Sequence, residues 1–245
     1  MSDRIFEIGG AGLESTDERV KKLMDNIVHA EVPGYQQSEA VISGFPLELD
    51  RANQKLSSVK PQTEGSFYSN LQGGLIKTGG KLDLALASDG YFVVAGPWGE
   101  GYTRDGRFRL DKDGKVLTVA GNYPVLGRSG PLVVTPGGDV EFTQSGELKV
   151  DGVLVDSIRV VKPEQQTQFE PVTGSLFKKT DNLSALQEIS TPRVIQGYVE
   201  SSNVNVVEQM MEMIALERTQ GLDTKVVQTR DSNLAKLLTI SQPSQ

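Results

Sequence analysis

Apolar residues near each end of the chain recur at the three- and four-residue steps that mark one face of a helix. Close to the N-terminus, Val20, Leu23 and Ile27 follow this spacing and predict a helix over residues 15–30. Near the C-terminus a longer pattern begins at residue 206 and predicts a second helix. At roughly thirty-five residues that helix would be about 50 Å long, which is more than the flank of a small domain can cover.

The middle of the chain has a different pattern, in which short apolar runs alternate with turn residues. This pattern extends from about residue 82 to residue 179 and predicts an antiparallel β domain. Asp-Gly pairs suit the tight turns of β-hairpins because both residues tolerate a positive φ. Four such pairs occur here, at residues 89–90, 105–106, 113–114 and 151–152. Residues 35–75 have weak periodicity and predict an extended connector.

Together these elements predict an α+β fold in which helices flank a β domain. Because the first helix is the only other strongly helical segment, we expect the two terminal helices to pair as a coiled coil. Two paired helices still expose apolar surface, so we expect them to pack against other subunits and to fold as they assemble. The predicted parts are an N-terminal helix (1–31), a connector (32–81), the β domain (82–194), a second connector (195–205) and a C-terminal helix (206–245).

Composition and charge exclude several classes of partner. The net charge is −7 and the pI is about 4.9, so the chain should be repelled by nucleic acid and by anionic membrane surfaces. The sequence contains no window of about 18 apolar residues and begins without the apolar stretch of a cleavable secretory signal. We therefore expect no direct membrane insertion and no cleavable signal. Cysteine is absent, which excludes disulfides and thiolate chemistry.

No segment predicts a catalytic, cofactor or metal site. The Asp111-Lys-Asp-Gly sequence superficially resembles a calcium loop but lacks the later ligands, so a hairpin turn is favoured. The glycines before Lys81 do not have the spacing of a phosphate-binding loop. His29 is the single histidine, and the sequence contains no nucleophile motif that it could activate. We expect a protein that is not an enzyme and has no cofactor.

The candidate functional residues are instead the apolar positions of the two terminal helices. They share helical spacing, and the methionines among them suit an interface that accepts slightly different neighbours. The predicted assembly interface consists of Leu23, Ile27, Val207, Met210, Met211, Ile214, Leu222, Val226, Leu234 and Leu237.

Several segments resemble one known family. Residues 197–210, Gly-Tyr-Val-Glu-Ser-Ser-Asn-Val-Asn-Val-Val-Glu-Gln-Met, closely resemble the C-terminal signature of flagellar basal-body rod and hook proteins. Residues 25–35, Asp-Asn-Ile-Val-His-Ala-Glu-Val-Pro-Gly-Tyr, are similar to the N-terminal motif of that family. Residues 65–92 and 101–117 resemble the start of its β domain. The resemblance covers nearly the whole chain.

The resemblance implies a structural subunit of the flagellar rod, the shaft between the inner membrane and the hook. Its implied partners are other copies of itself, other rod and hook-basal-body proteins and the flagellar type III export apparatus. Its implied location is the basal body in the periplasmic space. The β domain lacks the added outer domains of a full hook protein, and residues 124–132 are more similar to proximal than to distal rod members.

Other functions remain open at this point. A distal rod or hook-like axial protein is the nearest alternative. A soluble ligand-binding β module would have a defined pocket and ordered chain ends. A hydrolase would need two carboxylates about 5 to 9.5 Å apart across a cleft, and nothing in the sequence marks such a pair.

Overall fold

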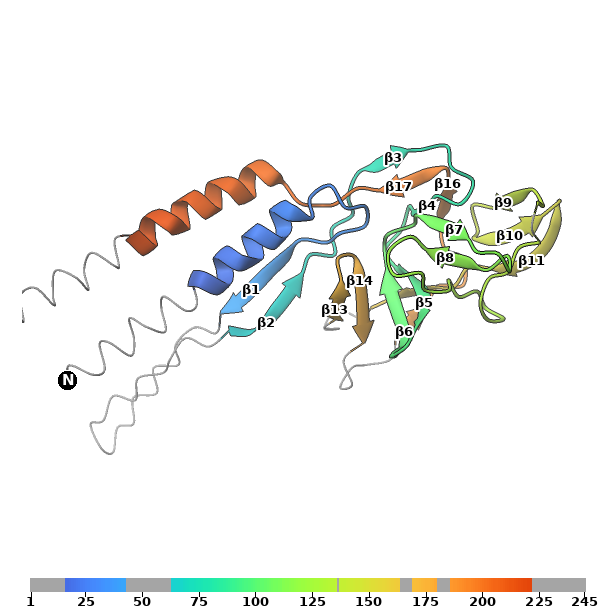
Figure 1. Cartoon of the computed structure of the whole chain (residues 1–245), viewed down its shortest axis with the longest axis horizontal. Coiled ribbons are helices and arrows are strands. Elements are labelled where there is room, and N and C mark those ends of the chain that lie inside the picture. Colours follow the sequence, from blue (N-terminus) through green and yellow to red (C-terminus); the bar gives the residue numbers. More distant parts are fainter. Residues whose placement is uncertain (1–15, 43–62, 136, 164–168, 180–185, 222–245) are drawn as a thin grey trace, which may run out of the picture. The chain divides into compact units, whose positions relative to one another are not determined.

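The computed structural model describes residues 16–42, 63–135, 137–163, 169–179 and 186–221 (Figure 1). These residues form two compact units. Unit 1 contains residues 16–27, 38–42, 63–67 and 205–221, and unit 2 contains residues 28–37 and the described part of 68–204. The domain boundaries expected from the sequence stay a prediction.

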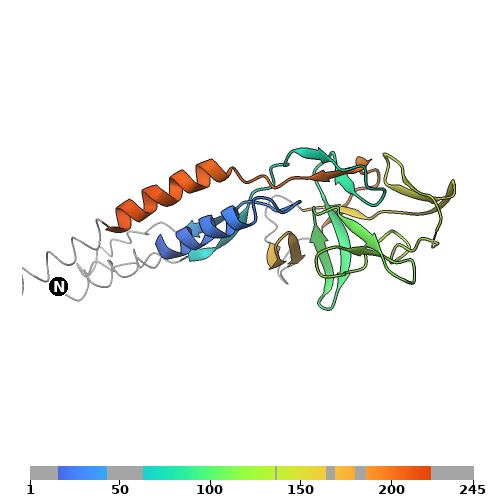
Figure 2. The ribbon, with the colours of Figure 1, turned by 45° about the horizontal axis from the view of Figure 1, so that its top comes forward.

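Unit 1 holds the two terminal helices and a pair of strands. The N-terminal helix covers residues 16–28 and the C-terminal helix covers residues 206–221. β1 (Ser38–Ile42) pairs with β2 (Thr63–Tyr68), and both strands lie beside the helices (Figures 1 and 2). Asn205 caps the C-terminal helix, because its side-chain oxygen accepts a hydrogen bond from Glu208 N at 3.4 Å. In the part of the chain that the structure describes, neither helix is long and apolar enough to cross a membrane.

The expectation that these helices pair as a coiled coil is wrong. A coiled coil requires apolar side chains in the seam between its helices. Polar pairs join the two helices, Arg19 with Glu212 at 2.8 Å and the buried Asn26 with Gln209 at 2.8 Å. Over the described residues the fold is mainly antiparallel β with two helices, so the α+β class fits it only in part.

Unit 2 is built from antiparallel strand pairs. A six-stranded sheet has the order β13-β14-β6-β5-β12-β15 and a three-stranded sheet has the order β11-β10-β9. Three two-stranded ribbons, β16-β4, β17-β3 and β7-β8, complete the unit. The strands are β3 (Leu75–Lys77), β4 (Leu84–Leu86), β5 (Tyr91–Gly96), β6 (Gly99–Thr103), β7 (Phe108–Leu110), β8 (Val116–Thr118), β9 (Val140–Phe142), β10 (Glu147–Val150), β11 (Val153–Ser157), β12 (Val160–Lys162), β13 (Phe169–Thr173), β14 (Leu176–Lys179), β15 (Gln187–Glu188), β16 (Val194–Gln196) and β17 (Tyr198–Glu200).

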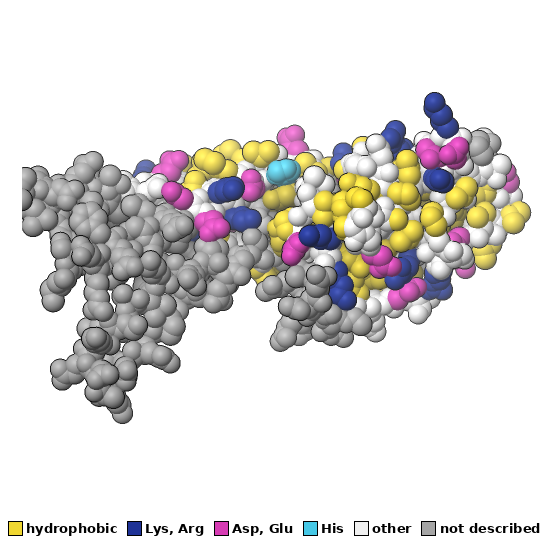
Figure 3. Space-filling view, turned by 60° about the horizontal axis from the view of Figure 1, so that its bottom comes forward, with side chains coloured by type: hydrophobic (Ala, Val, Ile, Leu, Met, Phe, Trp, Pro, Cys, Tyr) yellow, Lys and Arg dark blue, Asp and Glu magenta, His cyan; other side chains and the backbone are white. Residues whose placement is uncertain are grey.

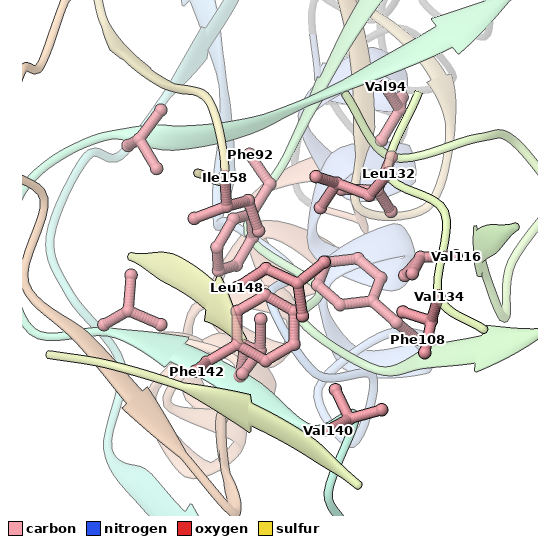
Figure 4. Close-up of a cluster of buried hydrophobic side chains, with 14 of the residues drawn as sticks. Phe92, Val94, Phe108, Val116, Leu132, Val134, Val140, Phe142, Leu148 and Ile158 are labelled. Carbon is pink, nitrogen blue, oxygen red and sulfur yellow. The ribbon is translucent and has the colours of Figure 1, made fainter. Parts of the chain in front are cut away.

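Two apolar clusters lie on opposite faces of β5, which is why its sequence is apolar at consecutive positions. Phe92 and Val94 belong to the larger cluster, together with residues such as Phe108 and Leu148 (Figure 4). Tyr91 and Val93 belong to the second, mainly aromatic cluster, which contains Tyr102, Phe169 and Phe177. β5 is thus the central strand of unit 2.

The Asp-Gly pairs adopt different conformations. Asp151 and Gly152 have φ values of 52° and 78° and form the tight turn between β10 and β11, as predicted. The pair at 113–114 lies in the loop between β7 and β8. The pair at 105–106 is not a hairpin turn. A Cβ on Gly106 would lie 1.6 Å from the carbonyl oxygen of Leu84, so glycine is required there for close backbone packing.

Candidate assembly interface

A buried asparagine fixes the elements of unit 1 against one another. Asn26 is 0% exposed. Its Nδ2 donates to the Ser38 carbonyl at 2.9 Å and to Gln209 Oε1 at 2.8 Å. Its Oδ1 accepts from Ser38 N at 2.9 Å and from Ser38 Oγ at 3.3 Å. The amide therefore has two donated and two accepted bonds, and it sets the register of the N-terminal helix, β1 and the C-terminal helix. We call this set the asparagine clamp.

Polar contacts nearer the surface extend the clamp. Arg19 and Glu212 form an ion pair, and Gln220 Nε2 donates to Asp17 Oδ1 at 2.7 Å. Both pairs are partly or fully exposed, so each contributes less than about 1 kcal/mol. The buried clamp therefore dominates the orientation of the C-terminal helix.

The C-terminal helix exposes an apolar stripe. Val207 lies three and four residues before Met210 and Met211, and these lie four and three residues before Ile214. The four side chains therefore share one helix face, and all four are exposed. We call these four residues the apolar stripe. On the face drawn in Figure 3, hydrophobic side chains gather in yellow patches between scattered charged groups. An apolar helix face in water is unfavourable, and it is typical of a surface that a partner covers.

The ten predicted interface residues have different positions. The four stripe residues lie together at the surface, whereas Leu23 is buried and Ile27 is half-buried within unit 1. Met24 is exposed on the N-terminal helix, although the sequence did not single it out. Four of the predicted residues lie outside the described part of the chain, namely Leu222, Val226, Leu234 and Leu237.

In unit 2, three segments that are distant in sequence meet in a hydrogen-bonded junction of residues 33–37, 69–74 and 200–203. Asn203 connects all three segments. Its backbone N donates to the Tyr35 carbonyl at 3.4 Å, and its Nδ2 donates to the carbonyls of Ser69 and Leu71 at 3.1 and 2.9 Å. Gln37 N in turn donates to Asn203 Oδ1 at 2.7 Å. The junction is therefore fixed by both backbone and side-chain bonds.

Two glycines of the junction allow backbones to approach too closely for any other residue. Gly34 has a φ of 69°, and a Cβ there would lie 2.2 Å from Asp105 N. A Cβ on Gly73 would lie 2.0 Å from the Ser201 carbonyl oxygen. Gly34 belongs to the Pro-Gly-Tyr end of the N-terminal motif of residues 25–35. Its role in the structure is this close backbone contact.

A buried ion pair anchors the junction to the β core. Arg104 and Glu200 are 2% and 3% exposed, and Arg104 Nη1 donates to Glu200 Oε1 at 3.1 Å. Gly73 N donates to the same carboxylate oxygen at 3.0 Å. The Arg104 guanidinium also lies 5.2 Å from the centre of the Tyr91 ring. Each charge therefore depends on the other for compensation.

The Tyr91 hydroxyl continues this network into the junction. It lies 2.7 Å from Gln36 Oε1 and 3.0 Å from Asn70 Oδ1, and it donates to one of these at a time. Burial of the hydroxyl raises the pKa of Tyr91 above its ordinary value. The tyrosine is therefore a neutral donor that joins the second apolar cluster to the junction.

The sequence missed the polar residues of both sites. Asn26 falls between Leu23 and Ile27 on the apolar face of its helix, and a polar residue in that position was a visible signal of a buried hydrogen bond. Glu200 follows the apolar Val199 at the end of a strand, but its partner Arg104 is 96 residues away. Nothing in a single sequence pairs those two charges.

The geometry is that of a structural subunit with a fixed apolar helix face. Two family descriptions match the chain, "Flagellar basal body rod FlgEFG protein C-terminal" over residues 195–240 and "Flagellar hook protein FlgE/F/G D1 domain" over residues 85–127. The flagellar basal-body rod protein FlgF of Escherichia coli K12 is 30% identical, over 96% of this chain and 97% of the relative. FlgG of Buchnera aphidicola from Schizaphis graminum is 29% identical, over 94% and 96% of the two chains. FlgF of Rhizobium meliloti is 28% identical, over 91% of each.

The chain therefore belongs to the flagellar basal-body rod protein family, and it is a structural subunit of the rod. The family match includes β17, the Asn203 link and the whole described C-terminal helix. It also includes β5 and Arg104. The matched segments thus include the apolar stripe and, of the junction, residues 200–203, whereas residues 33–37 and 69–74 lie outside them.

Replacing Asn26 with Asp tests the asparagine clamp. The carboxylate keeps the shape of the amide but cannot donate, so the Ser38 carbonyl and Gln209 Oε1 each lose a buried partner. We expect the helices of unit 1 to lose about 3 kcal/mol of stability, measured by far-ultraviolet circular dichroism during urea unfolding. Glu18→Gln, at an exposed position of the same helix, is the control and should be neutral. Equal effects of the two substitutions would contradict the clamp.

Replacing Glu200 with Gln tests the buried ion pair. The substitution leaves Arg104 buried without a compensating charge, and we expect unit 2 to lose about 3 kcal/mol of unfolding free energy. The single tryptophan, Trp98, lies in unit 2 and reports unfolding by fluorescence. Glu188→Gln removes a half-exposed partner of Arg128 and Arg159 and should cost less than about 1 kcal/mol. A Glu200→Gln protein as stable as this control would show that the pair contributes little.

Proposed function

We propose that this rod subunit assembles through the apolar stripe of its C-terminal helix, packed against neighbouring subunits of the flagellar axis around a central channel. The single observation that carries the proposal is the exposure of Val207, Met210, Met211 and Ile214 on one helix face. Burying an exposed aliphatic or methionine side chain contributes about 1.5–3 kcal/mol. Four such side chains provide a substantial driving force for association.

The asparagine clamp supports this proposal because it fixes the direction in which the stripe faces. Gln209 lies between Val207 and Met210 in the sequence, but its buried bond to Asn26 places it on the inner face of the helix. The neighbouring apolar positions therefore face away from the rest of unit 1. A helix that could rotate freely would bury its apolar face against its own unit. The clamped helix keeps that face available to another subunit.

The partners we propose are other copies of this chain and other rod and hook-basal-body proteins, with Ile27, Leu222, Val226, Leu234 and Leu237 as further contributors to the interface. The buried Leu23 would support the helix from within unit 1 and not contact a neighbour. Methionines at two of the four stripe positions suit contacts with related but non-identical neighbours, because their side chains are flexible and polarisable. In the assembled rod, the subunit would transmit torque through its helices and its β domain.

Within the rod we propose a proximal position, and we propose that the chain reaches the periplasmic space through the flagellar export apparatus. Similarity of residues 124–132 to proximal rod members supports the position. FlgG of Buchnera aphidicola is almost as similar overall, and a distal position is the second candidate. Membership of the rod protein family supports export by the flagellar route.

Replacing Ile214 with Asp tests the assembly function. A charge in the centre of the apolar stripe would have to be buried against a neighbour, so we expect at least a tenfold loss of this chain from isolated basal bodies, together with loss of motility. Thr219→Asp adds the same charge at an exposed position on the other side of the helix and should leave both unchanged. Trp98 fluorescence should be identical in the two proteins. Normal incorporation of the Ile214→Asp protein would contradict the proposed role of the stripe.

A further inference from the structure

Three buried polar atoms of the junction and its ion pair have no hydrogen-bond partner within the described residues, namely Gln36 Nε2, Arg104 Nε and Glu200 Oε2. The three residues are 2%, 2% and 3% exposed, so bulk solvent does not reach these atoms. Nearly all buried polar groups in native proteins are hydrogen-bonded, because a group that loses its bonds to water and gains none destabilises the fold. Three such atoms in one network therefore indicate a bound partner.

The three atoms belong to a single connected network around Tyr91. Arg104 Nη1 donates to Glu200 Oε1 at 3.1 Å, and the Arg104 guanidinium lies 5.2 Å from the centre of the Tyr91 ring. The Tyr91 hydroxyl in turn lies 2.7 Å from Gln36 Oε1. On each of the three side chains, the unpaired atom and a paired atom are bonded to the same carbon. The unpaired atoms are therefore next to groups that already contact one another.

The Tyr91 hydroxyl also responds to both members of the ion pair. Burial has the largest effect and raises the pKa of Tyr91, whereas the positive charge of Arg104 lowers this pKa and the negative charge of Glu200 raises it. Such effects require that both charges lie close to the hydroxyl. The side chain of Gln36, which is bonded to that hydroxyl, is therefore close to the ion pair as well.

The hydrogen-bonding character of the three atoms matches a single water molecule. Arg104 Nε and Gln36 Nε2 are donors, and Glu200 Oε2 is an acceptor. A water molecule can accept two hydrogen bonds and donate two, and a buried water typically makes about three. An anion would be repelled by the Glu200 carboxylate and a cation by the Arg104 guanidinium. A small neutral ligand with both donor and acceptor capacity therefore fits this set.

We propose that the junction binds one buried water molecule, which accepts hydrogen bonds from Arg104 Nε and Gln36 Nε2 and donates one to Glu200 Oε2. The water gives both oxygens of the carboxylate a partner, since Oε1 already accepts from Arg104 and Gly73. It also connects the Gln36 side chain directly to the ion pair. The water is thus a structural ligand that joins residues 33–37 to the buried charges of unit 2.

A high-resolution crystal structure of the full-length chain tests this site directly. We expect one peak of water density at about 2.7–3.2 Å from each of the three atoms. A dry site, in which the carboxylate rotates so that Arg104 Nε bonds directly to Glu200 Oε2, would overturn the proposal. Density for an ion of either charge at this position would overturn it as well.

Replacing Gln36 with Met tests whether the amide is a ligand of the water. The substitution nearly preserves the length of the side chain but removes the donor, so the occupancy of the water should fall at least threefold. Gln72→Met is the matched control, because the Gln72 amide donates to the Leu86 carbonyl and should leave the water in place. Equal occupancy in the two variants would contradict the role of Gln36. If Gln36→Met does not fold, the map of the unsubstituted chain decides the proposal.

Discussion

The bond between Arg104 and Glu200 joins residues 96 positions apart, and both side chains are almost completely buried. Neither charge is tolerable in that position without the other. Glu200 also accepts a bond from Gly73, and its backbone carbonyl accepts one from Gly34 at 2.9 Å. One carboxylate residue therefore holds three distant segments and the central β5–β6 region in a single arrangement. The arrangement of the junction segments therefore depends on this ion pair.

The asparagine clamp applies the same principle in unit 1. Apolar contacts are not directional, whereas a fully bonded amide accepts one geometry. Asn26 thus specifies which face of the C-terminal helix turns inward, and the exposed stripe is the consequence. In unit 1, polar residues thus set the geometry and leave the apolar stripe exposed.

Local patterns predicted much of this fold from the sequence. The helical spacing of Leu23 and Ile27, the short apolar runs of the β domain and the Asp151-Gly152 hairpin act over a few residues, and each is found in the structure. The prediction of a coiled coil was wrong because apolar periodicity indicates that a helix face will be covered. It does not indicate which other part of the protein, or which partner, covers that face. The clamp and the ion pair could not be predicted, since their partners are brought together by the tertiary fold alone.

Because its bonds reach the buried ion pair, the junction is part of the β core and not a flexible connection. Native-state hydrogen exchange on the full-length chain measures this. We expect the amides of Gly34, Gly73 and Gln37 to exchange with the same free energy of opening as core amides such as Val93 and Leu126, because all of them open only when unit 2 unfolds. Exchange of the three junction amides at a much lower free energy, while Val93 and Leu126 remain protected, would contradict it.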